Sequence, residues 1–157
     1  GCLSSGEAYR SINLKLVVIL GCMLGVGLAV DQSGLADTIA KHIVDFGRPL
    51  GPIGMLAAVY LATAVLTEIV TNAGTAGIMV PIGVATAKFA GVSERPFIMA
   101  VALAASCSLL TPIGYQTNLL VYGPGGYRFT DYLRVGLPLT ILLWVLATFL
   151  LPVVFPF

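Results

Sequence analysis

Long stretches without charge are the feature that most constrains this chain. Only one charged residue, Glu68, lies between Pro49 and Ala87, and none lies between Pro96 and Tyr127. Charged residues make up 10% of the 157 residues and hydrophobic residues 58%, whereas soluble domains carry about 25% charged residues. So few charges could not cover a soluble globular surface. The composition therefore excludes a soluble enzyme or a disordered segment and indicates a polytopic membrane protein.

Several kinds of site are excluded by the residue inventory. The net charge of +1 provides no basic surface for nucleic acid. Cys2, Cys22 and Cys107 lack metal-binding spacing, so we expect free thiols. His42 is the only histidine, which excludes a multi-histidine metal site, and the chain has no catalytic motif and no second buried acid to pair with Glu68. We expect neither an enzyme nor a resident cofactor.

The lengths of the apolar stretches and the spacing of polar residues between them predict an all-α polytopic membrane protein. A helix needs about 20 apolar residues to cross the hydrocarbon layer, whereas a short helix with one charged face lies along the interface. These rules predict a transmembrane helix over 12–30, an interfacial helix over 35–47, a hairpin over 51–89, a broken helix over 96–123 and a final transmembrane helix over 133–152. Four Lys and Arg residues lie near each of the two expected membrane faces, so charge leaves the orientation in the membrane open.

The hairpin and the broken helix are both interrupted by polar residues. The hairpin contains TEIVTNAGT at 67–75, and its arms of about 25 Å allow either two full crossings or a re-entrant hairpin whose tip stops inside the membrane. The second segment contains TPIGYQTN at 111–118, where Pro112 and Gly114 interrupt helical hydrogen bonding. Length alone does not decide between the two hairpin arrangements.

Paired interruptions of this kind are the best sequence pointer to the binding site of a transporter. The polar groups could simply join helices, but two interruptions, one beside an intramembrane carboxylate, favour a binding site. Hydroxyl, amide and carbonyl oxygens suit sodium, and N–H groups at helix starts suit an oxyanion. Neither turn contains Lys or Arg, so a bound anion would be neutralised by co-bound cations. This is the chemistry of cation-coupled anion symport.

The two turns resemble those of the divalent anion/sodium symporter family, within the wider citrate-transporter-like ion transporter superfamily. That family has two inverted repeats, each with a re-entrant hairpin tipped by Ser-Asn-Thr and a later broken helix of the form T-P-x-x-x-x-x-N. TEIVTNAGT and TPIGYQTN are similar to these motifs, and EAYRSIN at 7–13 with GLA at 34–36 resembles the start of the second repeat. The resemblance implies a re-entrant hairpin and a chain that forms the second, C-terminal repeat of a longer transporter.

The resemblance also implies which residues bind. A sodium site would be formed by Thr67, Val70, Asn72 and Gly114. Substrate contacts would come from Asn72, Ala73, Gly114, Tyr115, Gln116, Thr117 and Asn118. Ala73 replaces the Thr of the motif, and Tyr115-Gln-Thr-Asn118 replaces the Thr-Pro-Pro-Asn of dicarboxylate carriers. The string YQTNLLVYG at 115–123 looks more like the sulfate-transporting branch.

We therefore expect sodium-coupled symport of a divalent anion, with sulfate favoured and a dicarboxylate next. The alternative is a cation/proton antiporter working through Glu68. This acid could shape the tip, neutralise sodium or relay protons, and the first role predicts that Glu68→Gln is tolerated. The implied partners are the anion, sodium, the lipid bilayer, the N-terminal repeat of the same transporter and a second copy in a homodimer. The expected location is the plasma membrane, as a multi-pass protein.

Overall fold

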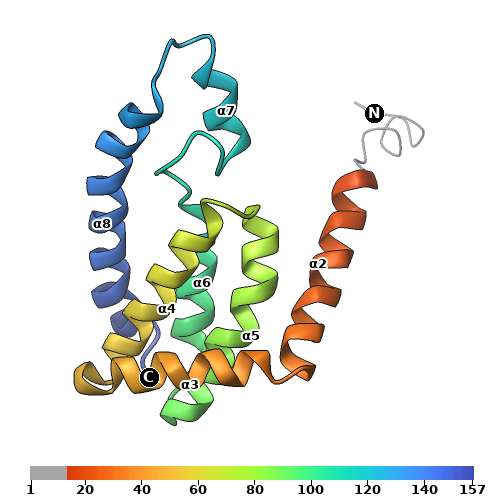
Figure 1. Ribbon diagram of the computed structural model, residues 1–157. Helices are drawn as coiled ribbons and strands as arrows, with labels where there is room; N and C mark the ends of the chain where they lie inside the picture. The colour runs from red at the N-terminus through yellow and green to blue at the C-terminus, as the bar shows by residue number, and fades with distance from the viewer. Residues whose placement is uncertain (1–13) are drawn as a thin grey trace, which may run out of the picture.

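Helices form all the regular secondary structure of residues 14–157, the part that the computed structural model describes (Figure 1). The prediction of an all-α protein is confirmed. In chain order the elements are α2 (Leu14–Gln32), α3 (Leu35–Gly47), the 3₁₀ turn η1 (Arg48–Leu50), α4 (Gly51–Thr67), α5 (Asn72–Ala90), α6 (Arg95–Ser106), α7 (Gln116–Tyr122) and α8 (Phe129–Val154). The 7–13 motif and Cys2 lie outside the described residues.

Local sequence explains where several helices begin and end. Gly34 precedes α3 with φ 73°, and Gly91 ends α5 with φ 69°, in the left-handed region that glycine adopts without strain. Thr71 caps α5, because its side chain accepts a hydrogen bond from Gly74 N at 3.2 Å. Pro96 lies in the first turn of α6, where its missing N–H costs no helical bond.

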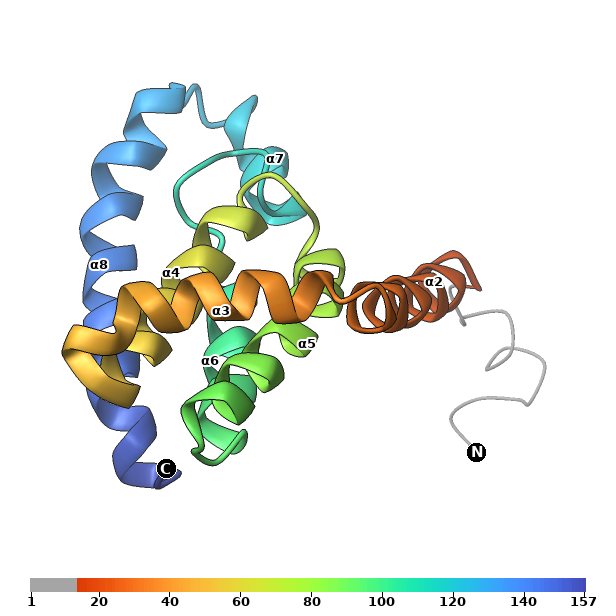
Figure 2. The ribbon, with the colours of Figure 1, turned by 60° about the horizontal axis from the view of Figure 1, so that its bottom comes forward.

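The helix α3 has one buried and one polar face, and it covers the same residues as the predicted interfacial helix. Ala36, Ala40 and Val44 are buried on one face, while the charged side chains on the other face are exposed. Figure 2 shows α3 lying across the ends of α4 and α5. The spacing of four between the buried residues keeps them on one side of the helix, so α3 packs flat against the other helices.

The core lies between α4, α5 and α6, with α3 across one end and α8 alongside α4. The largest fully buried hydrophobic side chains are Phe97, Leu56, Ile82, Val59 and Val101. Small residues allow close packing: a Cβ at Gly27 of α2 would lie 2.7 Å from Gly77 O of α5. The indole Nε1 of Trp144 donates to Ala57 O at 2.9 Å and so joins α8 to α4.

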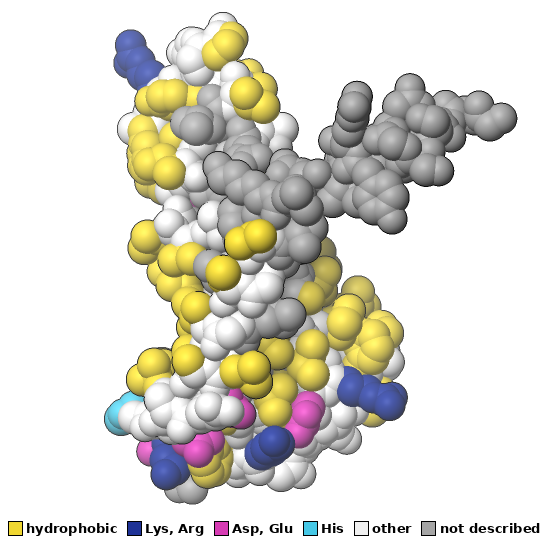
Figure 3. All heavy atoms as spheres, turned by 90° about the vertical axis from the view of Figure 1, so that its right-hand side faces the viewer, with side chains coloured by type: hydrophobic (Ala, Val, Ile, Leu, Met, Phe, Trp, Pro, Cys, Tyr) yellow, Lys and Arg dark blue, Asp and Glu magenta, His cyan; other side chains and the backbone are white. Residues whose placement is uncertain are grey.

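Charged and apolar side chains occupy different parts of the surface. In Figure 3, charged groups gather at the end formed by α3 and the α5–α6 connection, which carries Asp37, Lys41, His42, Asp45, Lys88 and Glu94. Large hydrophobic side chains of α8 are exposed, among them Leu142, Phe149 and Leu150. Within the described residues, α5 and α8 are long and apolar enough to cross a membrane. This distribution suits an apolar surrounding along the sides of the helices.

Candidate functional site

The tip of the α4–α5 hairpin is the first part of the candidate site in this chain. Helix α4 ends at Thr67, and the chain turns through Glu68, Ile69 and Val70 before Thr71 caps α5. The turn closes with a hydrogen bond from Val70 N to Leu66 O at 2.9 Å. Thr67 is fully buried and Glu68 is 8% exposed, whereas Ile69 is 80% exposed. The tip therefore turns Thr67 and Glu68 inward and leaves Ile69 outside.

The second part of the candidate site is the unwound segment between α6 and α7. Helix α6 ends at Ser106 and α7 begins at Gln116, with Pro112 and Gly114 between them as the sequence predicts. Two side chains bind the freed backbone groups: Thr111 Oγ1 accepts from Gly114 N at 3.0 Å, and Asn118 Nδ2 donates to Ser108 O at 3.0 Å and Thr111 O at 3.2 Å. These bonds replace the helical ones that the interruption removes.

The hairpin tip and the unwound segment meet through Glu68. Its Oε1 accepts from Leu110 N and its Oε2 from Thr111 N, both at 2.9 Å. Thr67 Oγ1 lies 2.8 Å from Ala105 O as donor, and the Ser108 hydroxyl donates to Thr67 O at 3.4 Å. Two interruptions that are more than 40 residues apart in sequence thus form one polar junction.

The Thr67 hydroxyl has two oxygen neighbours inside this junction. Ala105 O lies 2.8 Å away and Asn72 Oδ1 lies 3.1 Å away. A hydroxyl carries a single hydrogen, so it donates to only one of them at a time. When it donates to Ala105, the oxygens of Thr67 and Asn72 face each other without a proton between them, unless the Asn72 amide turns its Nδ2 toward Thr67. Such a pair of oxygens can be shared by a cation.

The predicted site residues fall into two groups. Thr67, Val70, Asn72 and Ala73 lie at the tip, buried or half-buried. Gly114 lies beside the tip: a Cβ there would contact Ser108 Oγ and come within 2.9 Å of Glu68 Oε2. Tyr115 and Thr117 are exposed at the start of α7, where Gln116 is the first helical residue. Asn118 is half-buried, and both of its amide hydrogens are used within the unwound segment.

Three participants in the junction are not singled out by the sequence: Ser108, Leu110 and, through its carbonyl oxygen, Ala105. Ser108 is a buried polar residue four positions before Pro112, and its place beside the interruption is a signal that could have identified it. Leu110 contributes only its backbone N–H, and no side-chain pattern reports such a contact. Within the described residues, no group of three or more His, Cys, Asp or Glu could hold a metal ion. A cation here would need hydroxyl, amide and carbonyl oxygens.

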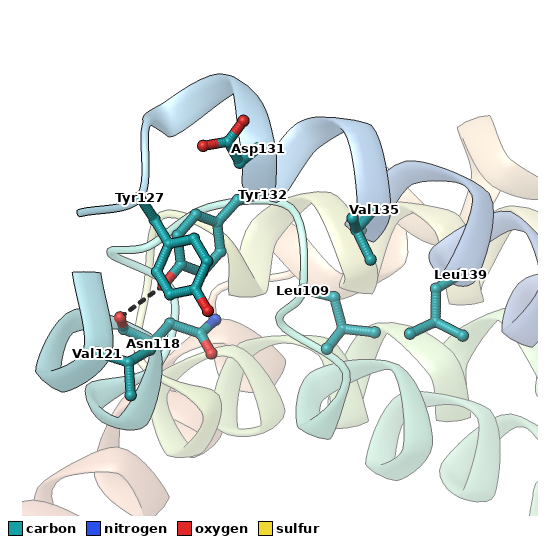
Figure 4. Close-up of a pocket in the computed structure, with 9 residues that line it drawn as sticks. Leu109, Asn118, Val121, Tyr127, Asp131, Tyr132, Val135 and Leu139 are labelled. Carbon is teal, nitrogen blue, oxygen red and sulfur yellow. Dashed lines mark hydrogen bonds between the residues drawn. The ribbon is translucent and has the colours of Figure 1, made fainter. Parts of the chain in front are cut away.

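A cavity of about 330 Å³ lies next to this junction, between the unwound segment, α7 and α8 (Figure 4). Its lining is mainly apolar and aromatic and is formed by Leu109, Asn118, Val121, Tyr127, Asp131, Tyr132, Val135, Gly136 and Leu139. Figure 4 shows the Tyr132 hydroxyl donating to Asn118 O, at 2.9 Å. Asn118 is thus held from both sides, by the unwound segment and by α8.

A sequence profile of the family described as citrate transporter matches residues 1–157. The chain belongs to this family. It is 45% identical to an uncharacterized transporter of Synechocystis over 96% of this chain and 24% of the relative. It is 36% identical to an uncharacterized transporter of Escherichia coli over 99% of this chain and 26% of the relative.

A third relative carries a more specific name. The chain is 32% identical to sodium/sulfate cotransporter 1 of Chlamydomonas reinhardtii, over 96% of this chain and 17% of that protein. The chain therefore spans about a quarter or less of each of these three relatives. The predicted family is confirmed.

Proposed function

We propose that the complete protein is a sodium-coupled symporter of a divalent anion, with sulfate favoured over dicarboxylates. The observation that carries this proposal is the meeting of the two interruptions, in which Glu68 accepts from the Leu110 and Thr111 amides at 2.9 Å. Non-helical backbone at membrane depth is tolerated where it is buried or lines a cavity. The named sodium/sulfate relative supports the choice of ions.

The proposed sodium site uses oxygens of Thr67, Val70, Asn72 and Gly114. The 3.1 Å separation between Thr67 Oγ1 and Asn72 Oδ1 supports this assignment, because neighbouring ligands of one cation approach each other this closely. The proximity of Gly114 to Glu68 brings the unwound segment to the same place. Sodium would balance the oxygen lone pairs that otherwise face each other.

The proposed anion site lies beside the cation, at Asn72, Ala73 and the segment from Gly114 to Thr117. Helix α5 begins at Asn72 and has no acidic residue in its first turn, so its N-terminal dipole would attract an anion. Tyr115 and Thr117 are exposed on the described chain and free to face the other half of a complete site. Asn118 would hold the unwound segment in place, because its amide hydrogens already bind backbone carbonyls.

The proposed membrane arrangement follows from the same geometry. The tip of the hairpin lies at the level where α6 ends, whereas α7 and the start of α8 extend beyond it (Figure 1). We infer a re-entrant hairpin that ends inside the bilayer, in the second repeat of a transporter whose first repeat completes the site. A homodimer in the plasma membrane remains part of this proposal.

The proton-coupled alternative receives less support. A carboxylate that relays protons would release at least one of its two backbone hydrogen bonds in every cycle, and both oxygens of Glu68 are occupied. The test is uptake of labelled sulfate and succinate into proteoliposomes that contain the full-length protein, with either a sodium or a proton gradient. We expect sulfate uptake that requires sodium. Uptake driven by protons alone would reject symport with sodium.

A further inference from the structure

Glu68 is a buried acid with an unusual set of partners. It is 8% exposed, and its two carboxylate oxygens accept from the consecutive amides of Leu110 and Thr111, at 2.9 Å each. The Thr111 hydroxyl adds a contact to the Glu68 carbonyl at 3.4 Å. The side-chain carboxylate and the backbone carbonyl of Glu68 therefore both bind the unwound segment.

The two amides need these acceptors. They lie in the irregular stretch after α6, where no helical carbonyl is in place to receive them. An unpaired N–H in an apolar surrounding costs free energy comparable to a lost hydrogen bond. One carboxylate supplies two charge-assisted bonds, which are stronger than neutral ones. Glu68, at the tip of the α4–α5 hairpin, thus supplies the acceptors that the unwound segment between α6 and α7 lacks.

We propose that Glu68 is a positioning residue that fixes the hairpin tip to the unwound segment as one unit. This inference rests on the proposed function, because the unit would hold the sodium ligands Thr67 and Asn72 at a fixed distance from Gly114. Glu68 itself touches neither ion. Its carboxylate acts through the backbone of Leu110 and Thr111.

The geometry distinguishes the two conservative replacements. In Glu68→Gln, the side-chain amide has one acceptor oxygen, so its NH₂ group faces a backbone N–H donor. In Glu68→Asp, both acceptor oxygens remain but the side chain is one methylene shorter. The isosteric Gln is therefore the more harmful change, contrary to the tolerance expected from its shape alone.

The test combines amide exchange with transport, on the full-length protein in nanodiscs and proteoliposomes. Loss of one charge-assisted bond corresponds to about tenfold in an opening equilibrium. We expect Glu68→Gln to speed hydrogen exchange in a peptide covering 107–115 about tenfold without sodium, and to raise the sodium concentration for half-maximal uptake several-fold. Glu94→Gln is the matched control, because Glu94 is a surface acid 3.9 Å from Lys88. It should change neither quantity.

The outcomes separate this inference from the proposed function. Unchanged exchange in folded Glu68→Gln overturns the positioning role, as does faster exchange with an unchanged sodium dependence. Faster exchange in a protein whose wild type transports without sodium supports the link between tip and segment and rejects the proposed coupling. If Glu68→Gln does not fold, Glu68→Asp is measured in its place. Faster hydrogen exchange in the 107–115 peptide than in Glu94→Gln supports the positioning role of Glu68. Exchange equal to that of the wild type overturns it.

Discussion

At the scale of single residues, the pairing of Thr67 with Asn72 is the most specific feature of the junction. Their side-chain oxygens lie 3.1 Å apart, although Thr67 already has an acceptor for its hydrogen in Ala105 O. With Nδ2 toward Thr67, the Asn72 amide donates to the hydroxyl; with its oxygen toward Thr67, the amide gains little from the protein alone. The gain would come with a cation, and substitutions at these positions should therefore affect transport more than folding.

The first prediction concerns Asn72→Ala. The change removes the amide from the start of α5 but leaves the cap at Thr71, which satisfies Gly74 N. We expect sodium-dependent uptake to fall at least a hundredfold, with the thermal midpoint within a few degrees of wild type. Gln32→Ala, at an exposed amide that ends α2, is the control. Wild-type uptake by Asn72→Ala would remove the hairpin tip from the site.

The second prediction concerns Gly114→Ala. The added Cβ would contact Ser108 Oγ and Glu68 Oε2, and overpacking of this kind costs about 1–3 kcal/mol. We expect a lower thermal midpoint and reduced uptake. Gly25→Ala lies inside α2 with nothing within 4 Å of the new methyl group. It should leave uptake unchanged and should not lower the thermal midpoint, because alanine favours the helix over glycine.

A double substitution tests the cause of that loss. Ser108→Ala removes the hydroxyl oxygen nearest to the new methyl group, so Gly114→Ala should cost less in its presence. Strictly additive effects on the thermal midpoint would show that the two positions do not interact.

At the scale of elements, hydrophobic periodicity predicts most helices well, and the differences have physical causes. The range 133–152 predicted for the last helix begins after Asp131, whereas α8 begins at Phe129. Asp131 explains the earlier start, because its carboxylate accepts from Arg128 N at 2.8 Å and caps the helix. Apolar length reports what can lie in a membrane, while capping decides where a helix begins.

The contacts between the hairpin tip and the unwound segment are harder to predict from sequence than the helices are. The sequence identifies both polar interruptions and places most of the candidate residues in them. It cannot show that the Glu68 carboxylate meets the backbone of Leu110, because such a contact leaves no pattern in side-chain type. Likewise, the use of both Asn118 amide hydrogens within its own segment depends on the path of the unwound chain.

The third prediction concerns the attachment of α7 to α8. The Tyr132 hydroxyl donates to Asn118 O at 2.9 Å, and a bond of this kind contributes about 1 kcal/mol. We expect Tyr132→Phe to lower the thermal midpoint by a few degrees and to speed amide exchange in α7. Tyr127→Phe is the matched control, since Tyr127 is exposed and contacts Tyr132 through its ring. If Tyr132→Phe has as little effect as Tyr127→Phe, packing of the retained ring, and not the hydroxyl bond, attaches α7.

At the scale of the whole molecule, the chain presents an incomplete site. It covers 24% of the length of its Synechocystis relative, and Tyr115 and Thr117 at the start of α7 are exposed. Under the proposed function, substrate choice would be a property of the complete protein, to which this chain would contribute Tyr115, Gln116 and Thr117. A dianion without a basic partner needs many convergent donors, and sulfate needs them more than a dicarboxylate does, because its charge is compact and strongly hydrated.

The fourth prediction uses this difference. Replacing Gln116 and Thr117 together by proline removes two polar side chains and two backbone N–H donors. Both positions lie in the first turn of α7, where backbone N–H groups have no partner within the helix, and Tyr115 is already extended with φ −139°, as a residue before proline prefers. We expect sulfate uptake to fall at least tenfold more than succinate uptake, measured in the full-length protein. Equal losses would place substrate choice in the other half of the site, and a wild type that carries succinate but not sulfate would reject the sulfate assignment.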